Sequence, residues 1–184
     1  MNKKFLYFLI FFFIILFIFG AFYREKQKKS EIKISPTSTS VAIQKDKIIA
    51  KVARVIDGDT IKVLISDKEE AVRLIGIDAP EITDSRKAIQ CFGKEASDKA
   101  KEVLGEKTVV LEADSTQDNK DKYGRLLRYV FVDGINLSKL MISQGYAHEY
   151  TYQNNPYKYM DEFKDAQEQA QKNKVGLWAD GICN

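Results

Sequence analysis

Short β-type runs separated by turns constrain the fold of this chain most strongly. Five runs rich in Val, Ile and Leu are bounded by Asp, Gly, Ser and charged residues, a pattern typical of strands. These runs are residues 48–56, 60–65, 71–77, 108–112 and 126–132. Two turn signals, Asp57-Gly58 and residues 66–69, separate the first three runs. The first three runs are therefore predicted to be neighbouring strands joined by short turns.

Three further stretches have helical periodicity. They are residues 94–104, 136–144 and 157–172, and the first two end at Gly105 and Gly145. The order of three strands, a helix, two strands and two helices predicts an α+β fold. About five strands without long βαβ crossovers favour a small closed barrel such as an OB-fold.

Two acidic fragments stand at the ends of β-type runs. The first reads Val-Ile-Asp-Gly-Asp-Thr over residues 55–60, and the second reads Arg-Leu-Ile-Gly-Ile-Asp-Ala-Pro-Glu over residues 73–81. Asp57 and Asp59 project to one side in extended backbone. Carboxylates that converge at strand ends make a site for a hard cation such as Ca²⁺. An arginine beside such a cation is suited to holding a phosphate, so the pattern indicates phosphodiester chemistry.

Each acidic fragment alone also has an ordinary structural explanation. Asp-Gly pairs are commonest in simple turns. An EF-hand is excluded, because the remaining ligand positions and its closing Glu are absent after Asp57. Arg73 could form an ion pair across the sheet, and Arg125, which follows Tyr123-Gly124, could be solvated.

Four fragments taken together, in order and spacing, are far more specific. They read IDGDT, RLIGIDAPE, FGKEA and DKYGR, at residues 56–60, 73–81, 92–96 and 121–125. In this respect the chain resembles the staphylococcal nuclease (thermonuclease) family over about residues 47–180. The resemblance implies a five-stranded OB-type barrel with three helices. It also implies a Ca²⁺-dependent nuclease that acts on DNA and RNA and leaves 3′-phosphate ends.

The resemblance also implies a metal site. Asp59 and Asp78 would be carboxylate ligands of Ca²⁺, with the backbone carbonyl of Ala79 as a third ligand and Asp57 in support. The family usually has Thr where this chain has Ala79. A carbonyl ligand does not need the hydroxyl, so we expect the change to be harmless.

By the same resemblance, Arg73 and Arg125 would bind the phosphate. Glu81 would act on the attacking water, as general base or as the group that orients it, and both roles remain open. The positions that would line the nucleotide pocket are Lys122, Tyr123, Tyr150 and Tyr152.

The remaining aromatic and histidine residues leave alternatives. The single histidine, His148, rules out a mechanism that needs two histidines in one chain, and a carboxylate is the natural substitute. We expect His148 to be a partly exposed structural residue. The tyrosine-rich stretch 146–159 either stacks on nucleobases or caps the barrel as an amphipathic part of the core.

The N-terminus is predicted to contact a membrane. Residues 5–23 contain no charged residue and follow Lys3 and Lys4. A helix of that length would span roughly 28 Å, close to the hydrocarbon core of a bilayer. We favour an uncleaved anchor over a cleaved signal. Basic residues flank both ends, so the positive-inside rule does not decide the orientation.

The chain is thus predicted to have three parts, namely the hydrophobic helix 1–23, a flexible linker 24–46 and the globular domain 47–184. Cys91 and Cys183 are a candidate disulfide, which would place the domain outside the cytoplasm. The alternative is two unpaired thiols.

The leading expectation is an extracytoplasmic, monomeric, calcium-dependent nuclease. A second hypothesis is a nucleic-acid-binding module on the same barrel without catalysis. A third is a membrane-tethered structural domain that uses a cation only for stability. The net charge of +3 is too small to choose among them.

Overall fold

The computed structural model describes residues 46–82 and 90–183. Five strands form a closed barrel in the order β3-β2-β1-β5-β6, and a parallel pairing of β3 with β6 closes it. All the other pairings within the barrel are antiparallel. The five strands are β1 (Lys47–Val55), β2 (Thr60–Ile65), β3 (Lys68–Leu74), β5 (Thr108–Glu112) and β6 (Leu126–Val132).

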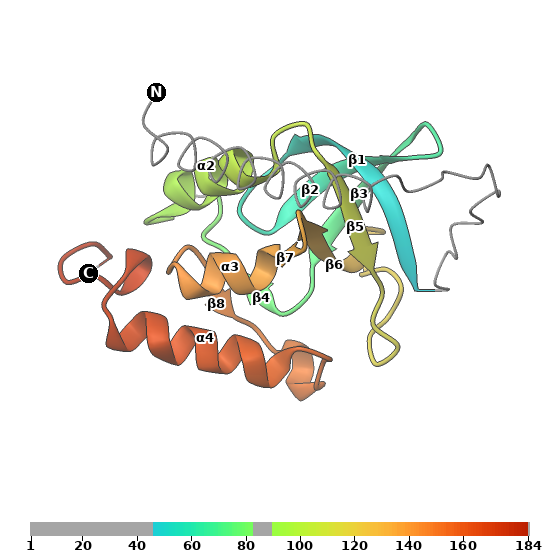
Figure 1. The fold of residues 1–184 in the computed structure, drawn as a ribbon. Helices are drawn as coiled ribbons and strands as arrows, with labels where there is room; N and C mark the ends of the chain where they lie inside the picture. Colours follow the sequence, from blue (N-terminus) through green and yellow to red (C-terminus); the bar gives the residue numbers. More distant parts are fainter. Residues whose placement is uncertain (1–45, 83–89, 184) are drawn as a thin grey trace, which may run out of the picture. The chain divides into compact units, whose positions relative to one another are not determined.

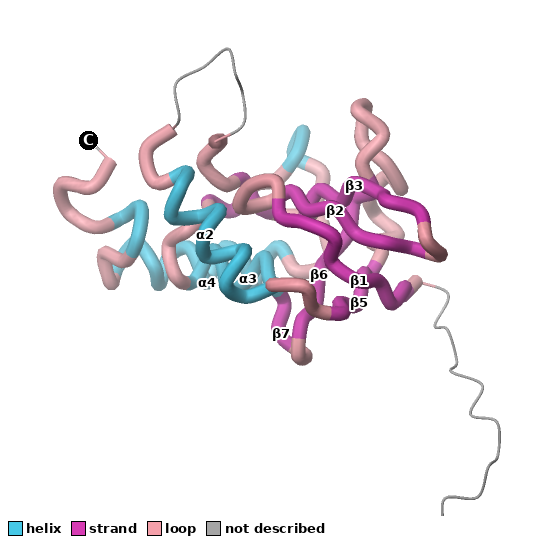
Figure 2. The backbone as a smooth tube through the Cα atoms, turned by 90° about the horizontal axis from the view of Figure 1, so that it is seen from above, coloured by secondary structure: helices cyan, strands magenta, loops and turns pink. Residues whose placement is uncertain are grey.

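Three helices lie beside the barrel (Figure 1). They are α2 (Gly93–Leu104), α3 (Leu137–Ser143) and α4 (Met160–Lys172). Seen from above, the helices gather on one side of the described domain and the barrel strands on the other (Figure 2). Each helix buries an apolar face, and in α4 that face is Phe163, Ala166 and Ala170. Asn136 begins α3 by accepting a hydrogen bond from the backbone N–H of Lys139.

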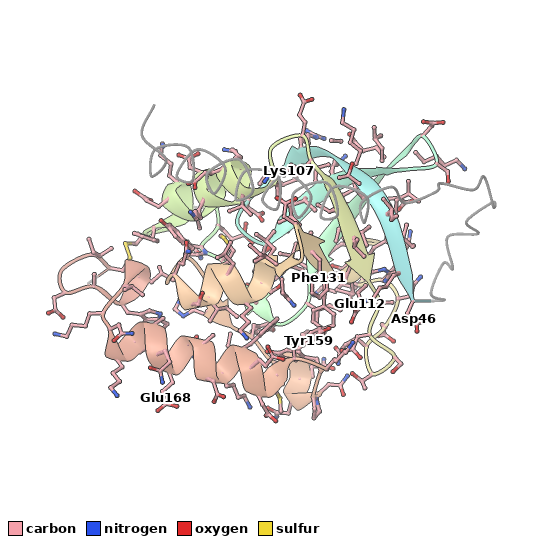
Figure 3. All side chains as sticks on the ribbon, viewed as in Figure 1. Asp46, Lys107, Glu112, Phe131, Tyr159 and Glu168 are labelled. Atoms are coloured by element: carbon pink, nitrogen blue, oxygen red, sulfur yellow. A yellow bond between two sulfur atoms is a disulfide. The ribbon has the colours of Figure 1, made fainter. Side chains whose placement is uncertain are left out.

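A polar network joins the barrel to the segment before α4. Glu112 is buried on β5 and accepts hydrogen bonds from Lys158 and from the Tyr159 hydroxyl, and Figure 3 shows Tyr159 beside Glu112 and Phe131. Tyr129 is fully buried and donates its hydroxyl hydrogen to Asp114 at 2.6 Å. Every group in this network has a partner, so it specifies the packing as well as contributing to it.

Short strands complete the site end of the barrel. β4 (Ile77–Asp78) pairs antiparallel with β8 (His148–Glu149), which places Asp78 opposite His148. A third short strand, β7 (Ile135–Asn136), pairs with β6. These two-residue strands carry too little pattern to be visible in the sequence.

The structure confirms the predicted closed five-stranded barrel with three helices. Three boundaries differ from the prediction by more than one residue. β3 ends at Leu74 rather than at residue 77, because Ile75 and Gly76 turn the chain, with φ of 79° at Gly76, before the separate strand β4. β3 begins at Lys68, because Ser66 and Asp67 alone make the turn, with φ of 47° and 63°. α4 begins at Met160, because Tyr159 before it has non-helical dihedral angles, with φ of −107° and ψ of 19°.

The predicted hydrophobic helix 1–23 and almost all of the linker 24–46 lie outside the described residues. Neither described range holds a helix with the length and apolarity needed to cross a bilayer. The structure joins Cys91 to Cys183 by a disulfide, with the two Cα atoms 5.7 Å apart.

Candidate functional site

The first acidic turn joins β1 to β2 and is held by its own polar groups. The backbone N–H groups of Ile56 and Asp57 both donate to the carbonyl of Thr60. The N–H of Asp59 donates to Asp57 Oδ1 at 3.1 Å, and Thr60 Oγ1 donates to Asp59 Oδ1 at 2.9 Å. Asp57 and Asp59 are both buried. Asp57 therefore orients the turn that carries Asp59.

The second acidic turn follows β3 and is organised by Arg73. Its Nη1 donates to the carbonyl oxygens of Leu74 and Ile77, at 2.8 and 2.7 Å. Its Nε lies 3.2 Å from Asp59 Oδ1, and its Nη2 lies 3.1 Å from Asp78 Oδ1. A single guanidinium thus contacts carboxylates from both turns.

A missing side chain lets the two turns approach each other. The N–H of Ala79 donates to Asp59 Oδ2 at 2.8 Å. A Cβ atom on Gly58 would lie 2.5 Å from the Cβ of Ala79, which is too close for unshifted packing. A glycine is therefore required at position 58 because there is no room for a side chain, and not because the backbone has a positive φ. The resulting cradle places Asp59, Asp78 and Ala79 together.

Negative charge accumulates around the two turns. Burial, followed by the charges of Asp59 and Glu81, raises the pKa of Asp57 to about 7. Burial is also the main cause that raises the pKa of Asp78 and of Glu81, with Asp59 adding to both. The positive charge of Arg73 lowers the pKa of Asp78 and of Glu81 but does not cancel the rise. The site favours an added cation.

Glu81 lies just past the second turn with its side chain exposed. Its backbone N–H donates to the Gln90 side-chain oxygen at 2.8 Å, and its carbonyl accepts from the Gln90 N–H at 3.0 Å. These bonds hold the main chain of Glu81 and leave the carboxylate open to solvent.

A third turn, 121–125, brings the second arginine. The Asp121 side chain accepts from the N–H groups of Tyr123 and Arg125, and its Oδ2 lies 2.7 Å from Arg125 Nε. Arg125 Nη1 lies 3.4 Å from Thr60 Oγ1. The guanidinium of Arg125 therefore lies beside the first acidic turn. It contacts Thr60, and Arg73 contacts the preceding residue, Asp59.

The tyrosines of the 146–159 stretch differ in exposure, and Tyr146 and Tyr159 are partly buried against the core. Tyr150 and Tyr152 are exposed, with ring centroids 6.4 Å apart, whereas Tyr157 is buried. Tyr123 is also exposed, and the charged ends of Lys122 and Arg125 lie 5.0 and 5.4 Å from its ring centre. Tyr157 belongs to the core, as the second interpretation of this stretch expects, and stacking of Tyr150 and Tyr152 on nucleobases stays a prediction.

The donor set fits a hard cation. Two carboxylates and a backbone carbonyl are all oxygen donors, which Ca²⁺ prefers. Across the described ranges, no three or more His, Cys, Asp or Glu side chains stand close enough to hold a metal ion by themselves. The predicted set calls for only two such side chains as direct ligands, Asp59 and Asp78, with the carbonyl of Ala79 beside them.

Comparison with known proteins identifies the family. Residues 71–180 match the family described as Staphylococcal nuclease homologue. The chain belongs to the staphylococcal nuclease family. It is 42% identical over 129 residues to a thermonuclease of Staphylococcus hyicus, covering 70% of this chain and 75% of that protein.

Two proteins of Bacillus subtilis (strain 168) are also similar to this member of the staphylococcal nuclease family. Endonuclease YncB is 37% identical over 137 residues, which cover 74% of this chain. The SPbeta prophage-derived endonuclease YokF is 39% identical over 127 residues, which cover 68% of this chain. The matched regions span only 64% and 42% of the lengths of YncB and YokF.

Three contacts in this nuclease-family site have no clear signal in the sequence. Gln90 bonds the main chain of Glu81, and Thr60 lies beside Arg125. His148 is exposed, faces Asp78 across the β4–β8 pair, and its ring meets Trp178 edge to face at 4.8 Å. Each pair is separated by intervening chain, so only folding brings its members together.

Proposed function

We propose that this protein is a calcium-dependent nuclease that hydrolyses phosphodiester bonds of DNA and RNA. One observation carries the proposal. Two guanidiniums approach adjacent residues of one acidic turn, since Arg73 contacts Asp59 and Arg125 contacts Thr60. Relatives named endonuclease and thermonuclease support nuclease activity.

In this proposal the arginines bind and polarise the phosphate. Attack on a phosphodiester adds negative charge to the phosphoryl oxygens, and fixed cations placed there lower the barrier. A guanidinium offers forked N–H donors that match two oxygens of one phosphate, which a lysine cannot do. Arg73 makes four contacts with protein oxygen atoms, which hold its guanidinium in place and leave one N–H group free. To present a forked pair of donors to a phosphate, it exchanges one of these protein contacts for a phosphate oxygen.

Asp59, Asp78 and the carbonyl of Ala79 would hold Ca²⁺, with Asp57 orienting the turn. A bound Ca²⁺ supplies positive charge next to the phosphate and polarises its oxygens. Glu81 would accept a proton from the attacking water or orient that water, and it is exposed enough to reach it.

The nucleotide would lie against the exposed aromatic rim. Tyr123, Tyr150 and Tyr152 present ring faces that can stack on unpaired bases with little sequence preference. Lys122 adds positive charge for the backbone. We therefore propose attack on single-stranded or transiently open nucleic acid. The resemblance to the thermonuclease family adds the proposal that cleavage is endonucleolytic and leaves 3′-phosphate ends.

We also propose that the domain acts as a monomer on the outer side of the membrane, anchored through residues 1–23 or released by their cleavage. The Cys91–Cys183 disulfide supports an oxidising compartment. Protease added to intact cells is expected to remove an anchored domain. Protection of the domain would contradict the outward orientation.

The activity is tested with closed circular plasmid and a single-stranded RNA. Cleavage is expected with Ca²⁺, is expected to stop with a calcium chelator, and should return when Ca²⁺ is added in excess. A phosphatase should be needed before the products can be extended at their 3′ ends, because a 3′-phosphate blocks extension.

Glu81→Gln is the matched variant for this assay. It should bind a labelled single strand as the wild type does but cleave about 10²–10⁴-fold more slowly, because general acid–base catalysis contributes on that order. A wild-type protein that shifts nucleic acid in a gel but never cuts it would instead support the non-catalytic binding module.

A further inference from the structure

Gln90 clamps the main chain of Glu81 from both sides. Its side-chain oxygen accepts the Glu81 N–H at 2.8 Å, and its own N–H donates to the Glu81 carbonyl at 3.0 Å. The two residues are nine positions apart. Two hydrogen bonds between one pair of residues fix both the position and the orientation of the Glu81 peptide units.

Packing against helix α2 makes this clamp tight. The N–H of Gly93 donates to the Gln90 carbonyl at 3.0 Å, which sets the turn that leads into α2. A Cβ atom on Gly93 would lie 3.0 Å from the carbonyl oxygen of Glu81 and 3.1 Å from that of Pro80. The start of α2 therefore lies close to the backbone that carries Glu81, with no room for a side chain at Gly93.

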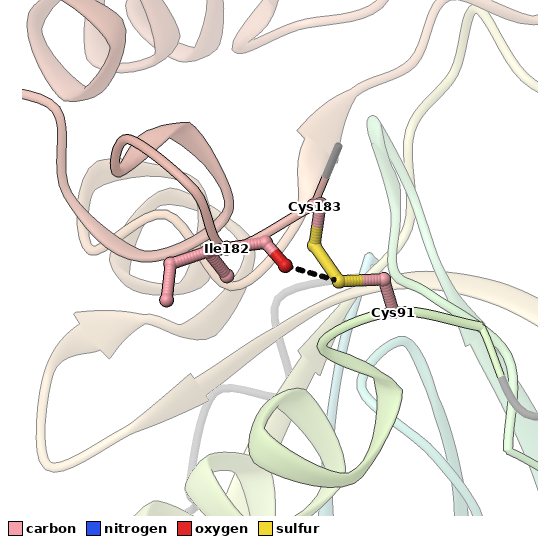
Figure 4. The surroundings of a disulfide bond; sticks show 3 residues. All are labelled: Cys91, Ile182 and Cys183. Atoms are coloured by element: carbon pink, nitrogen blue, oxygen red, sulfur yellow. Dashed lines mark hydrogen bonds between the residues drawn. A yellow bond between two sulfur atoms is a disulfide. The ribbon is translucent and has the colours of Figure 1, made fainter.

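A covalent bond anchors the same turn to the end of the chain. Cys91 follows Gln90 and is bonded to Cys183, and its sulfur lies 3.1 Å from the carbonyl oxygen of Ile182 (Figure 4). A disulfide sulfur carries no hydrogen, so this last approach is a contact rather than a hydrogen bond. The C-terminal segment is itself tied to the domain, because the N–H of Leu177 donates to the Gly145 carbonyl at 2.8 Å.

Exposure explains why such an anchor matters. Glu81, Gln90 and Cys91 are all exposed, so water competes for the two hydrogen bonds of the clamp. A hydrogen bond in that setting has a small net free energy. A disulfide next to Gln90 limits how far the turn moves when a hydrogen bond opens. The carboxylate of Glu81 depends on that turn for its position.

We propose that Gln90 is a positioning residue for Glu81, and that the Cys91–Cys183 disulfide holds Gln90 in place. The inference rests on the proposed nuclease function, in which Glu81 acts on the attacking water. Gln90 touches neither water nor phosphate in this scheme and acts only through Glu81. A displacement of about 1 Å at a reacting group lowers the rate by about 10²-fold, so a loosened clamp affects turnover before it affects binding.

The first test compares two substitutions of similar size in the full chain. Gln90→Met removes the acceptor for the Glu81 N–H, and Gln90→Glu keeps an oxygen at the same reach. We expect Gln90→Met to lower kcat about 10-fold to 100-fold with KM within about twofold, and Gln90→Glu to keep most of the rate. Thermal unfolding of both variants should match the wild type within a few degrees.

A double-mutant cycle separates positioning from a general structural role. If Gln90 acts through Glu81, Gln90→Met should have no further effect on kcat in a Glu81→Gln background. Equal losses in both backgrounds would overturn the inference, and so would a wild-type kcat for Gln90→Met. A wild-type protein that does not cleave at all would instead refute the proposed function, which keeps the two failures distinct.

The second test breaks the disulfide. Tris(2-carboxyethyl)phosphine reduces the bond to two thiols and is oxidised to the phosphine oxide, with the oxygen and two protons taken from water. We expect kcat of the folded, reduced wild type to fall to the range of Gln90→Met while single-strand binding is retained. The Cys91→Ala/Cys183→Ala variant should have the same low kcat with or without reductant. A reduced, folded protein with full turnover would overturn the role of the disulfide.

Discussion

The two turns that bring charge to the candidate site are built in different ways. The acidic turn 57–60 is buried, and its Asp59 is held by Arg73 and by Ala79, which lies twenty residues further along the chain. The basic turn 121–125 is largely exposed, and Asp121 holds it through bonds to residues within four positions. One turn depends on the tertiary fold, and the other forms its own local structure.

Because of this difference, substitutions in the two turns should affect stability and activity differently. A change in the acidic turn disturbs buried polar groups that then lack partners, so it should lower both the stability and the rate. A change in the basic turn breaks a partly exposed ion pair, which contributes at most about 1 kcal/mol. It should therefore affect nucleic acid cleavage with little change in stability.

The largest effect is expected from Arg73→Lys compared with Arg125→Lys. Both should lower kcat about 10²–10³-fold, because lysine cannot offer a forked pair of donors. Only Arg73→Lys should also lower the free energy of unfolding, by about 1–3 kcal/mol, since it removes the donor that Arg73 gives to the carbonyls of Leu74 and Ile77. Denaturant titration and single-turnover cleavage measure the two quantities. Equal loss of stability in both variants would break the comparison.

A smaller effect is expected from alanine at the two glycines. Gly58→Ala forces Ala79 aside and should lower the free energy of unfolding by about 1–3 kcal/mol. It should also raise the Ca²⁺ concentration that gives half-maximal activity. In Gly124→Ala the added Cβ has no atom within 4 Å, so the only cost is the backbone strain of a φ of 81°. That strain should lower the free energy of unfolding by about 1–2 kcal/mol. The Ca²⁺ dependence of this variant should be that of the wild type. An unchanged Ca²⁺ dependence in Gly58→Ala would show that Ala79 is not a ligand.

The smallest effect is expected at the exposed rim. Tyr123→Ala should weaken binding of a short single strand by about 1 kcal/mol, the lower end of the range for a stacked base. Tyr123→Phe keeps the ring and should bind as the wild type does. Neither change should move the midpoint of thermal unfolding, because the side chain of Tyr123 is 72% exposed. Equal binding by all three proteins would remove Tyr123 from the nucleotide pocket.

Much of the fold follows from local patterns. The barrel strands and the three helices were predictable because periodicity and turn chemistry act over a few residues. The ends of these strands and helices were less predictable, as α4 illustrates. The sequence around Tyr157 continues a helical pattern, but Asp114, more than forty residues earlier, takes the N–H of Lys158. A side chain from a distant turn thus holds the segment that precedes the helix, a contact that no local pattern reveals.

The chemical inventory of the site was readable from the chain alone. Two carboxylate turns, two arginines and a glutamate stand in a characteristic order, and each fragment is a local property of its residues. Only the tertiary structure decided which of these groups meet: that Arg73 bridges Asp59 and Asp78, and that Gln90 holds Glu81. Such contacts close loops of many residues, so their free energy depends on the packing of the whole barrel rather than on any local segment.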